Sequence, residues 1–74
     1  MKEELLELLA DIRPEFDFAE STNFIEEGML DSFDIVSLVT AIDDKYQVAI
    51  DGVDIIPENF SNLESIESLI NKSK

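Results

Sequence analysis

The seven residues Gly28-Met29-Leu30-Asp31-Ser32-Phe33-Asp34 stand between a long aperiodic stretch and the most apolar helical segment of the chain. The glycine permits a tight turn, the leucine can anchor it, and aspartate is a preferred cap at a helix start. We therefore predict that Asp31 caps a helix running from about Ser32 to Tyr46. A serine at a helix start is more often a cap than a reactive group, but capping by Asp31 leaves the hydroxyl of Ser32 free and facing water.

This central helix is predicted to have a wide apolar face. Its main stripe, at helical spacing, consists of Ile35, Leu38, Val39, Ile42 and Tyr46. Phe33 and Val36 are expected to widen that stripe. The residues expected to face outward are Asp34, Ser37, Asp44 and Lys45.

Three further segments carry helical signals. Residues 3–12 predict an amphipathic helix that ends before Pro14. Residues 57–60 can form a single turn with proline at its first position. The last helix extends to the C-terminus and is expected to begin at a capping box made by Ser61 and Glu64. The sequence therefore predicts an all-α fold of three longer helices and one short helix.

The two long connections are both rich in apolar residues. Residues 13–30 are too apolar for a solvated linker and too long for a plain tether, so we predict an ordered loop. The side chains expected to pin it are Phe16, Phe18, Phe24 and Ile25. Residues 47–56 alternate around Asp51-Gly52 as in a hairpin, but two isolated strands are only marginally stable. We favour an irregular loop whose apolar residues fill the core.

Composition narrows the chemistry available to the chain. Its 74 residues predict a single domain, residues 1–74, and include no cysteine and no histidine. The chain thus lacks thiol nucleophiles, the commonest general base and the usual transition-metal ligands. The segment Asp51-Gly52-Val53-Asp54 also lacks the alternating oxygen ligands of a calcium-binding loop. We expect a protein that is not an enzyme and has no metal site.

The charge balance indicates what kind of partner the chain can meet. Eighteen acidic against five basic residues give a formal net charge of −13, which repels nucleic acid and anionic lipid. The expected partners are proteins with basic patches, and solubility is the alternative explanation for the acidity. The N-terminus has no apolar signal-peptide core, and no apolar run is long enough for a membrane span. We therefore expect a cytoplasmic monomer.

Asp31-Ser32-Phe33 resembles the Asp-Ser-hydrophobic motif that opens the second helix of acyl carrier and peptidyl carrier proteins. Length, acidity, the long first loop, the helix order and residues 61–66 extend the resemblance over essentially the whole chain. It implies a small four-helix carrier bundle in which a phosphopantetheinyl transferase moves 4′-phosphopantetheine from coenzyme A onto Ser32, flanked by Asp31 and Phe33. The terminal thiol of this arm would hold a thioester, which the cysteine-free chain cannot form by itself.

The resemblance also implies a recognition face on the second helix that meets basic patches on partner enzymes. The acidic residues at matching positions are Asp31, Asp34, Asp43 and Asp44, and Val36 and Ser37 are expected to join the contact. A solvated helix face is the alternative interpretation for each of them. The partners implied are the transferase, a ligase that loads acyl or aminoacyl groups, and downstream transferases or synthases.

Several positions depart from the pattern of bacterial fatty-acid carriers. They are Phe33, Ser37, Thr40 and Lys45. A carrier dedicated to a secondary metabolite, an amino acid or a cell-envelope pathway therefore fits at least as well as one serving fatty-acid synthesis. The neighbouring residues Val36, Val39 and Thr40 either line a cleft for an acyl chain or belong to the core.

The function expected from the sequence is a stand-alone carrier of thioester-bound intermediates. The pathways open to it are fatty acid, polyketide, nonribosomal peptide and cell-envelope biosynthesis. The alternative is an acidic helical adaptor that docks on a basic protein and carries no covalent cofactor. Ser32 distinguishes the two, because an adaptor would not need its hydroxyl.

Overall fold

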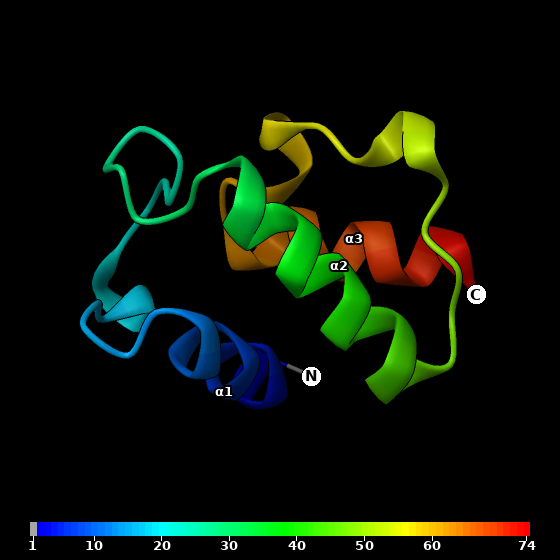
Figure 1. Ribbon diagram of the computed structural model, residues 1–74, viewed down its shortest axis with the longest axis horizontal. Coiled ribbons are helices and arrows are strands. Elements are labelled where there is room, and N and C mark those ends of the chain that lie inside the picture. The colour runs from blue at the N-terminus through cyan, green and yellow to red at the C-terminus, as the bar shows by residue number, and fades with distance from the viewer. Residues whose placement is uncertain (1) are drawn as a thin grey trace.

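The computed structural model describes residues 2–74, which contain three α-helices and three short 3₁₀ helices (Figure 1). In chain order they are α1 (Lys2–Ile12), η1 (Phe18–Glu20), α2 (Ser32–Tyr46), η2 (Gly52–Asp54), η3 (Pro57–Phe60) and α3 (Leu63–Ser73). Helix α1 packs against both α2 and α3, and η3 also contacts both of these helices. The predicted all-α fold with three longer helices is confirmed, including the boundaries of α2 and the short turn at residues 57–60.

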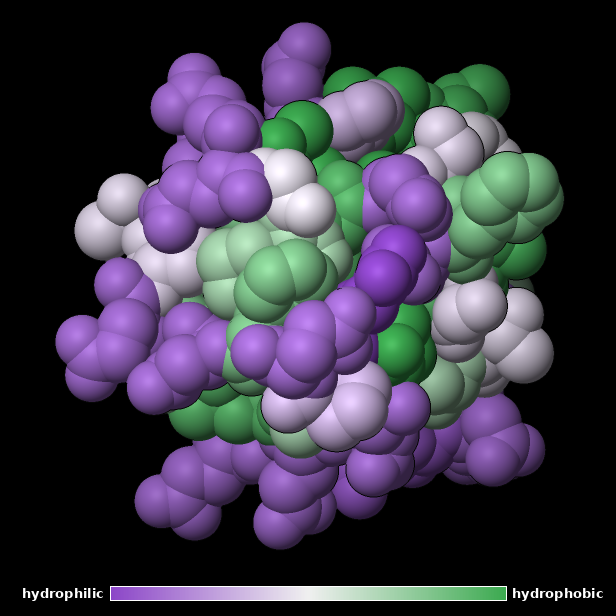
Figure 2. Space-filling view, turned by 60° about the vertical axis from the view of Figure 1, so that its left-hand side comes forward, coloured by the Kyte–Doolittle hydropathy of each residue, from purple (hydrophilic) through white to green (hydrophobic). Residues whose placement is uncertain are grey.

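The core draws on all three α-helices, on η1 and η3, and on both long connections. Its fully buried side chains are Leu5, Leu9, Phe24, Leu38, Ile42, Phe60, Ile66 and Ile70. Burying one such side chain contributes about 1.5–3 kcal/mol wherever it lies in the chain, so Phe24 in the first connection stabilises the fold as much as one buried leucine of a helix. On the face drawn in Figure 2, hydrophilic side chains cover the upper left, the bottom and part of the middle, and hydrophobic ones gather in patches near the centre and at the right-hand edge.

The first connection is an ordered loop, as predicted. Phe18 and Phe24 are buried and meet edge to face with their ring centroids 5.1 Å apart. The amide of Phe24 donates to the carbonyl of Ser61 at 2.7 Å, which ties this loop to the residues before α3. Gly28 adopts a positive φ of 72°, a conformation that glycine reaches at no steric cost. These contacts anchor the loop, and the loop leads into the start of α2.

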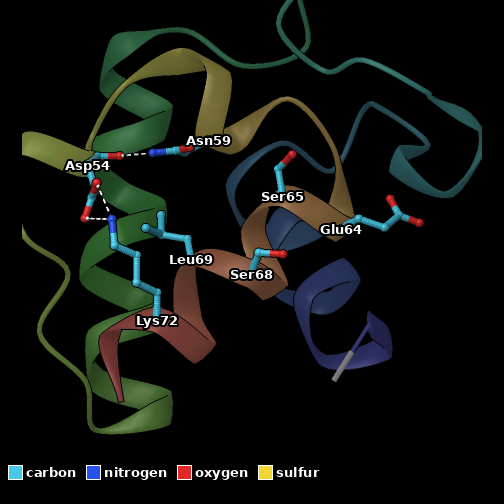
Figure 3. Close-up of a pocket in the computed structure, with 7 residues that line it drawn as sticks. All are labelled: Asp54, Asn59, Glu64, Ser65, Ser68, Leu69 and Lys72. Carbon is cyan, nitrogen blue, oxygen red and sulfur yellow. Dashed lines mark hydrogen bonds and ion pairs between the residues drawn. The ribbon is translucent and has the colours of Figure 1, made fainter.

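The second connection, which runs from α2 to α3, does not form a hairpin, and its apolar residues are not all buried in the core. Ile50 is buried, but Val53 is 78% exposed and Ile56 is exposed as well, so the expectation that its apolar residues fill the core is only partly met. Lys72 Nζ reaches from α3 to the Asp54 carboxylate at 3.0 Å (Figure 3). Asn59 donates to the carbonyl of Asp54 at 2.7 Å, and the three residues border a polar hollow of about 330 Å³.

The start of α3 corrects one prediction. Asn62, not Ser61, is the N-cap, and its side-chain oxygen accepts from the amide of Ser65 at 2.8 Å. Ser61 instead donates its hydroxyl to the carbonyl of Glu58. Glu64 is thereby moved to the second helical position, where it cannot close the predicted capping box, and it pairs with Lys2 at 3.3 Å.

Candidate functional site

Ser32 is the first residue of α2, and Asp31 caps this helix as predicted. One oxygen of the Asp31 carboxylate, Oδ1, accepts from the amide of Asp34 at 3.0 Å. In return, Asp34 Oδ2 accepts from the amide of Asp31 at 3.1 Å, which closes a capping box. The two aspartates therefore fix the backbone on both sides of Ser32.

The Ser32 side chain lies on the surface with its hydroxyl unused by the fold. Ser32 is exposed, and within residues 2–74 no hydrogen bond engages its Oγ, because Asp31 supplies the cap. An exposed hydroxyl on a fixed backbone is accessible to a modifying enzyme. The structure thus places Ser32 where the sequence predicted it, at the mouth of the central helix.

Asp34 does not face outward, contrary to the prediction. It is only 8% exposed, and its Oδ2 accepts from Arg13 Nε at 2.9 Å as well as from the Asp31 amide. A buried carboxylate needs such partners, because an unpaired buried charge is costly. Asp34 therefore holds the start of α2 to the end of α1 and is not available for contact with a partner protein.

Arg13 is the residue at this site that sequence reasoning missed. Its guanidinium also contacts Asp31 Oδ2 at 3.3 Å and Glu15 Oε2 at 3.2 Å. The hydrogen bond to Asp34, followed by the one to Glu15, raises the pKa of Arg13, and the Asp34 amide is the largest cause that lowers the pKa of Asp31. The only signal in the sequence was a lone arginine in a strongly acidic chain.

Phe33 and Val36 do not widen the buried stripe of α2. Phe33 is 84% exposed and Val36 is 59% exposed. Helical geometry places them on the outer face together with three further exposed residues, Ser37, Thr40 and Asp44. Of the three residues proposed for a cleft or the core, Val39 is buried in the core, whereas Val36 and Thr40 lie outside it.

The remaining candidate recognition residues divide between this outer face and its edge. Ser37 and Asp44 are exposed on it beside Val36. Asp43 is half-buried, and its Oδ1 accepts from the amide of Ile50 at 3.3 Å, so part of its carboxylate stabilises the second connection. The outer face of α2 is therefore apolar near Ser32, and toward its C-terminal end it carries Asp44 beside Lys45, which is exposed as predicted.

A small hollow adjoins the candidate attachment residue. Its volume is about 160 Å³, and it is lined by Ser32, Ile35, Val36, Ile55 and Pro57. Apart from the serine, these side chains are apolar. The surface that leads from Ser32 toward the second connection therefore carries no charged side chain within this hollow.

Comparison with protein families gives one match. The model of the family described as "phosphopantetheine attachment site" matches residues 3–71. Neither the curated proteins nor the solved structures yielded a match. None of the helices in residues 2–74 combines the length and apolarity needed to cross a membrane.

Proposed function

The chain belongs to the phosphopantetheine attachment-site family, and from this premise we propose that it is a stand-alone carrier with its arm on Ser32. Members of this family carry 4′-phosphopantetheine covalently, are generally not catalytic, and interact with phosphopantetheinyl transferases and biosynthetic enzymes. The observation that carries the proposal is the exposed hydroxyl of Ser32, which the capping role of Asp31 leaves free. In this proposal residues 1–74 act as one monomeric carrier domain.

The proposed loading step uses groups that fit the site. Ser32 Oγ attacks the phosphorus of coenzyme A that bears the pantetheine, and an O–P bond forms as the bond to adenosine 3′,5′-bisphosphate breaks. In this proposal the hydroxyl proton passes to a base on the transferase. When bound, the arm supplies the thiol on which a cargo is carried as a thioester.

Residues around Ser32 support a phosphodiester at this position. The N-terminus of α2 carries partial positive charge, which favours an anionic group, and the Arg13 guanidinium offsets the charge of Asp31 and Asp34. The apolar hollow that Ile55 and Pro57 help to line lies directly beside the hydroxyl. These features would favour a phosphodiester on Ser32 and would give the adjoining part of an arm an apolar surface to contact.

We place partner recognition on the exposed face of α2. Val36, Ser37 and Asp44 offer an apolar and acidic surface to the basic patches of a transferase, a loading ligase and downstream enzymes. Asp43 contributes at the edge, and Asp34 is left out because it is buried. The departures at Phe33, Ser37, Thr40 and Lys45 mean that a dedicated pathway fits at least as well as general fatty-acid synthesis.

Intact-protein mass spectrometry tests the attachment. The apo protein is incubated with coenzyme A, magnesium and a broad-specificity phosphopantetheinyl transferase, and one phosphopantetheinyl group is expected to be added. Ser32→Ala should abolish this mass step and still fold, because Asp31 keeps the capping role. The matched control is Ser68→Ala, which changes an exposed serine of α3 and should load like the wild type.

Two results would contradict the proposal. A wild-type protein that takes up no group would favour the acidic adaptor, which needs no covalent cofactor. Equal modification of Ser32→Ala and wild type would move the attachment point to another residue. Circular dichroism of each variant distinguishes loss of the site from loss of the fold.

A further inference from the structure

Arg13 follows the last residue of α1, and its guanidinium reaches the start of α2. Its Nε donates to Asp34 Oδ2 at 2.9 Å, and its Nη2 contacts Asp31 Oδ2 at 3.3 Å. Its Nη1 donates to Glu15 Oε2 at 3.2 Å. The backbone amide of Arg13 also donates to the carbonyl of Leu9 at 2.9 Å, so the side chain projects from a continuation of the α1 hydrogen-bond pattern.

The arginine contacts and the capping box share atoms. Asp34 Oδ2 accepts from both Arg13 Nε and the amide of Asp31. Asp31 uses Oδ1 for the amide of Asp34 and Oδ2 for Arg13. These four hydrogen bonds form a closed ring around the backbone of residues 31–34. Ser32 lies inside that segment but contributes no atom to the ring, so the ring can fix its position while leaving its hydroxyl free.

We propose that Arg13 is a positioning residue for the modification of Ser32, because its planar fork fixes Asp31 and Asp34 together and thereby holds the first turn of α2. This inference rests on the proposed attachment of the arm to Ser32. Arginine suits the role because its guanidinium offers several donors in one rigid plane, whereas a lysine ammonium is a compact point charge. The fork also contacts the two carboxylates beside which the new phosphodiester forms.

The ionisation of the ring supports this geometry. The hydrogen bond to Asp34 is the main cause that raises the pKa of Arg13. The Asp34 amide is the main cause that lowers the pKa of Asp31, and the charge of Arg13 acts in the same direction. At neutral pH the contact between Arg13 and Asp31 is therefore fully ionic.

Transferase kinetics on two charge-matched variants test the proposal. Arg13→Gln and Lys72→Gln each remove one positive charge from a chain with a formal net charge of −13, but Lys72 pairs with Asp54 at the other connection. Arg13→Gln should lower kcat for modification about tenfold and change the KM for the carrier less than about twofold, because the serine is misplaced while the exposed face of α2 is intact. Lys72→Gln should leave both constants unchanged.

Amide hydrogen exchange of the apo proteins gives a second readout that needs no transferase. The amides of Asp31 and Asp34 donate within the ring, so Arg13→Gln should speed their exchange about tenfold and Lys72→Gln should not. Arg13→Lys keeps the charge and loses the fork, and it should resemble Arg13→Gln more than the wild type. If Arg13→Gln does not fold, Arg13→Lys replaces it in both measurements.

The outcomes separate this inference from the proposed function. A wild-type protein that is modified on Ser32, together with Arg13→Gln modified at the same kcat, overturns the positioning role alone. Full activity and wild-type exchange in Arg13→Lys overturn it too, because charge without the fork would then suffice. A wild-type protein that takes up no arm overturns both proposals.

Discussion

The connection between α1 and α2 and the connection between α2 and α3 are both long and apolar, but the fold holds them in different ways. The first buries Phe18 and Phe24 in an edge-to-face pair and ends in the hydrogen-bonded ring around Ser32. The second buries Ile50 and Phe60 but leaves Val53 78% exposed. Apolar content alone therefore does not tell whether a loop packs, whereas clustered aromatic residues do.

This difference matters at the candidate site, because the two connections border Ser32 from different directions. The first leads directly into Asp31 and sets the backbone of the serine. The second supplies Ile55 and Pro57 to the hollow beside it. The first connection thus fixes the backbone of the serine. The surface along which an arm would lie belongs to the second connection, which is less buried.

The largest expected effect comes from removing an aromatic anchor of the first connection. Phe24 is fully buried, so Phe24→Ala should lower the free energy of unfolding by about 3–5 kcal/mol. Val53→Ala in the second connection should lower it by less than about 0.5 kcal/mol, since that side chain is already in water. Urea unfolding followed by circular dichroism measures both. Similar losses in the two variants would show that the connections are equally anchored.

The ion pairs of the two connections should also differ. Asp34 is buried against Arg13, and Asp34→Asn should cost about 1–3 kcal/mol because a neutral amide oxygen accepts the bond from the guanidinium more weakly than a carboxylate does and leaves the charge of Arg13 without this partner. Lys72→Gln breaks the pair with Asp54, in which the lysine side chain is 67% exposed, and should cost less than about 1 kcal/mol. The same urea experiment measures the free energy of unfolding of both variants. A greater decrease in Lys72→Gln than in Asp34→Asn would show that the exposed pair stabilises the fold more than the buried one.

Most of the architecture near Ser32 could be predicted from the sequence. The apolar period and the capping aspartate gave the limits of α2, and the aromatic residues of the first connection indicated an ordered loop. The orientation of three residues was missed because hydrophobic type was weighed above helical phase. At about 100° per residue, the buried Leu38 lies close to Asp34 around the helix and far from Phe33, so Phe33 faces water.

The contacts of Arg13 could not be predicted in the same way. Its partners Asp31 and Asp34 follow it only after the whole first connection, and no period or motif links residues so far apart. Their approach depends on how the first connection folds back, which is decided by the packing of Phe18 and Phe24. A lone arginine in an acidic chain indicates an ion pair, but it does not indicate which carboxylates take part.

The end of the second connection allows a finer test at adjacent residues. Asn62 caps α3 through the amide of Ser65, so Asn62→Ala should cost about 1 kcal/mol. Ser61→Ala removes only the hydroxyl bond to the Glu58 carbonyl and should cost less. Thermal unfolding of the two variants measures the difference. Serine and asparagine are both good caps, which is why the sequence pattern alone placed this helix start one residue too early. A larger loss in Ser61→Ala would restore the original capping box.

The smallest expected effect concerns Tyr46, the last residue of α2 before the second connection. Burial, followed by the hydrogen bond that its hydroxyl donates to Glu4 at 3.2 Å, raises the pKa of Tyr46 from 10.0 to about 12. The folded state therefore favours the neutral phenol. This stabilisation is complete below the unfolded pKa of about 10 and is lost as the pH rises through about 12.

Tyr46→Phe cannot ionise, so its melting temperature should fall less than that of the wild type between about pH 10 and pH 12. Because Tyr46 is the only tyrosine in the chain, the difference between the two curves reports on this junction alone. Parallel curves would mean that the phenol titrates alike in the folded and unfolded protein, and that the contact with Glu4 does not stabilise the start of the second connection.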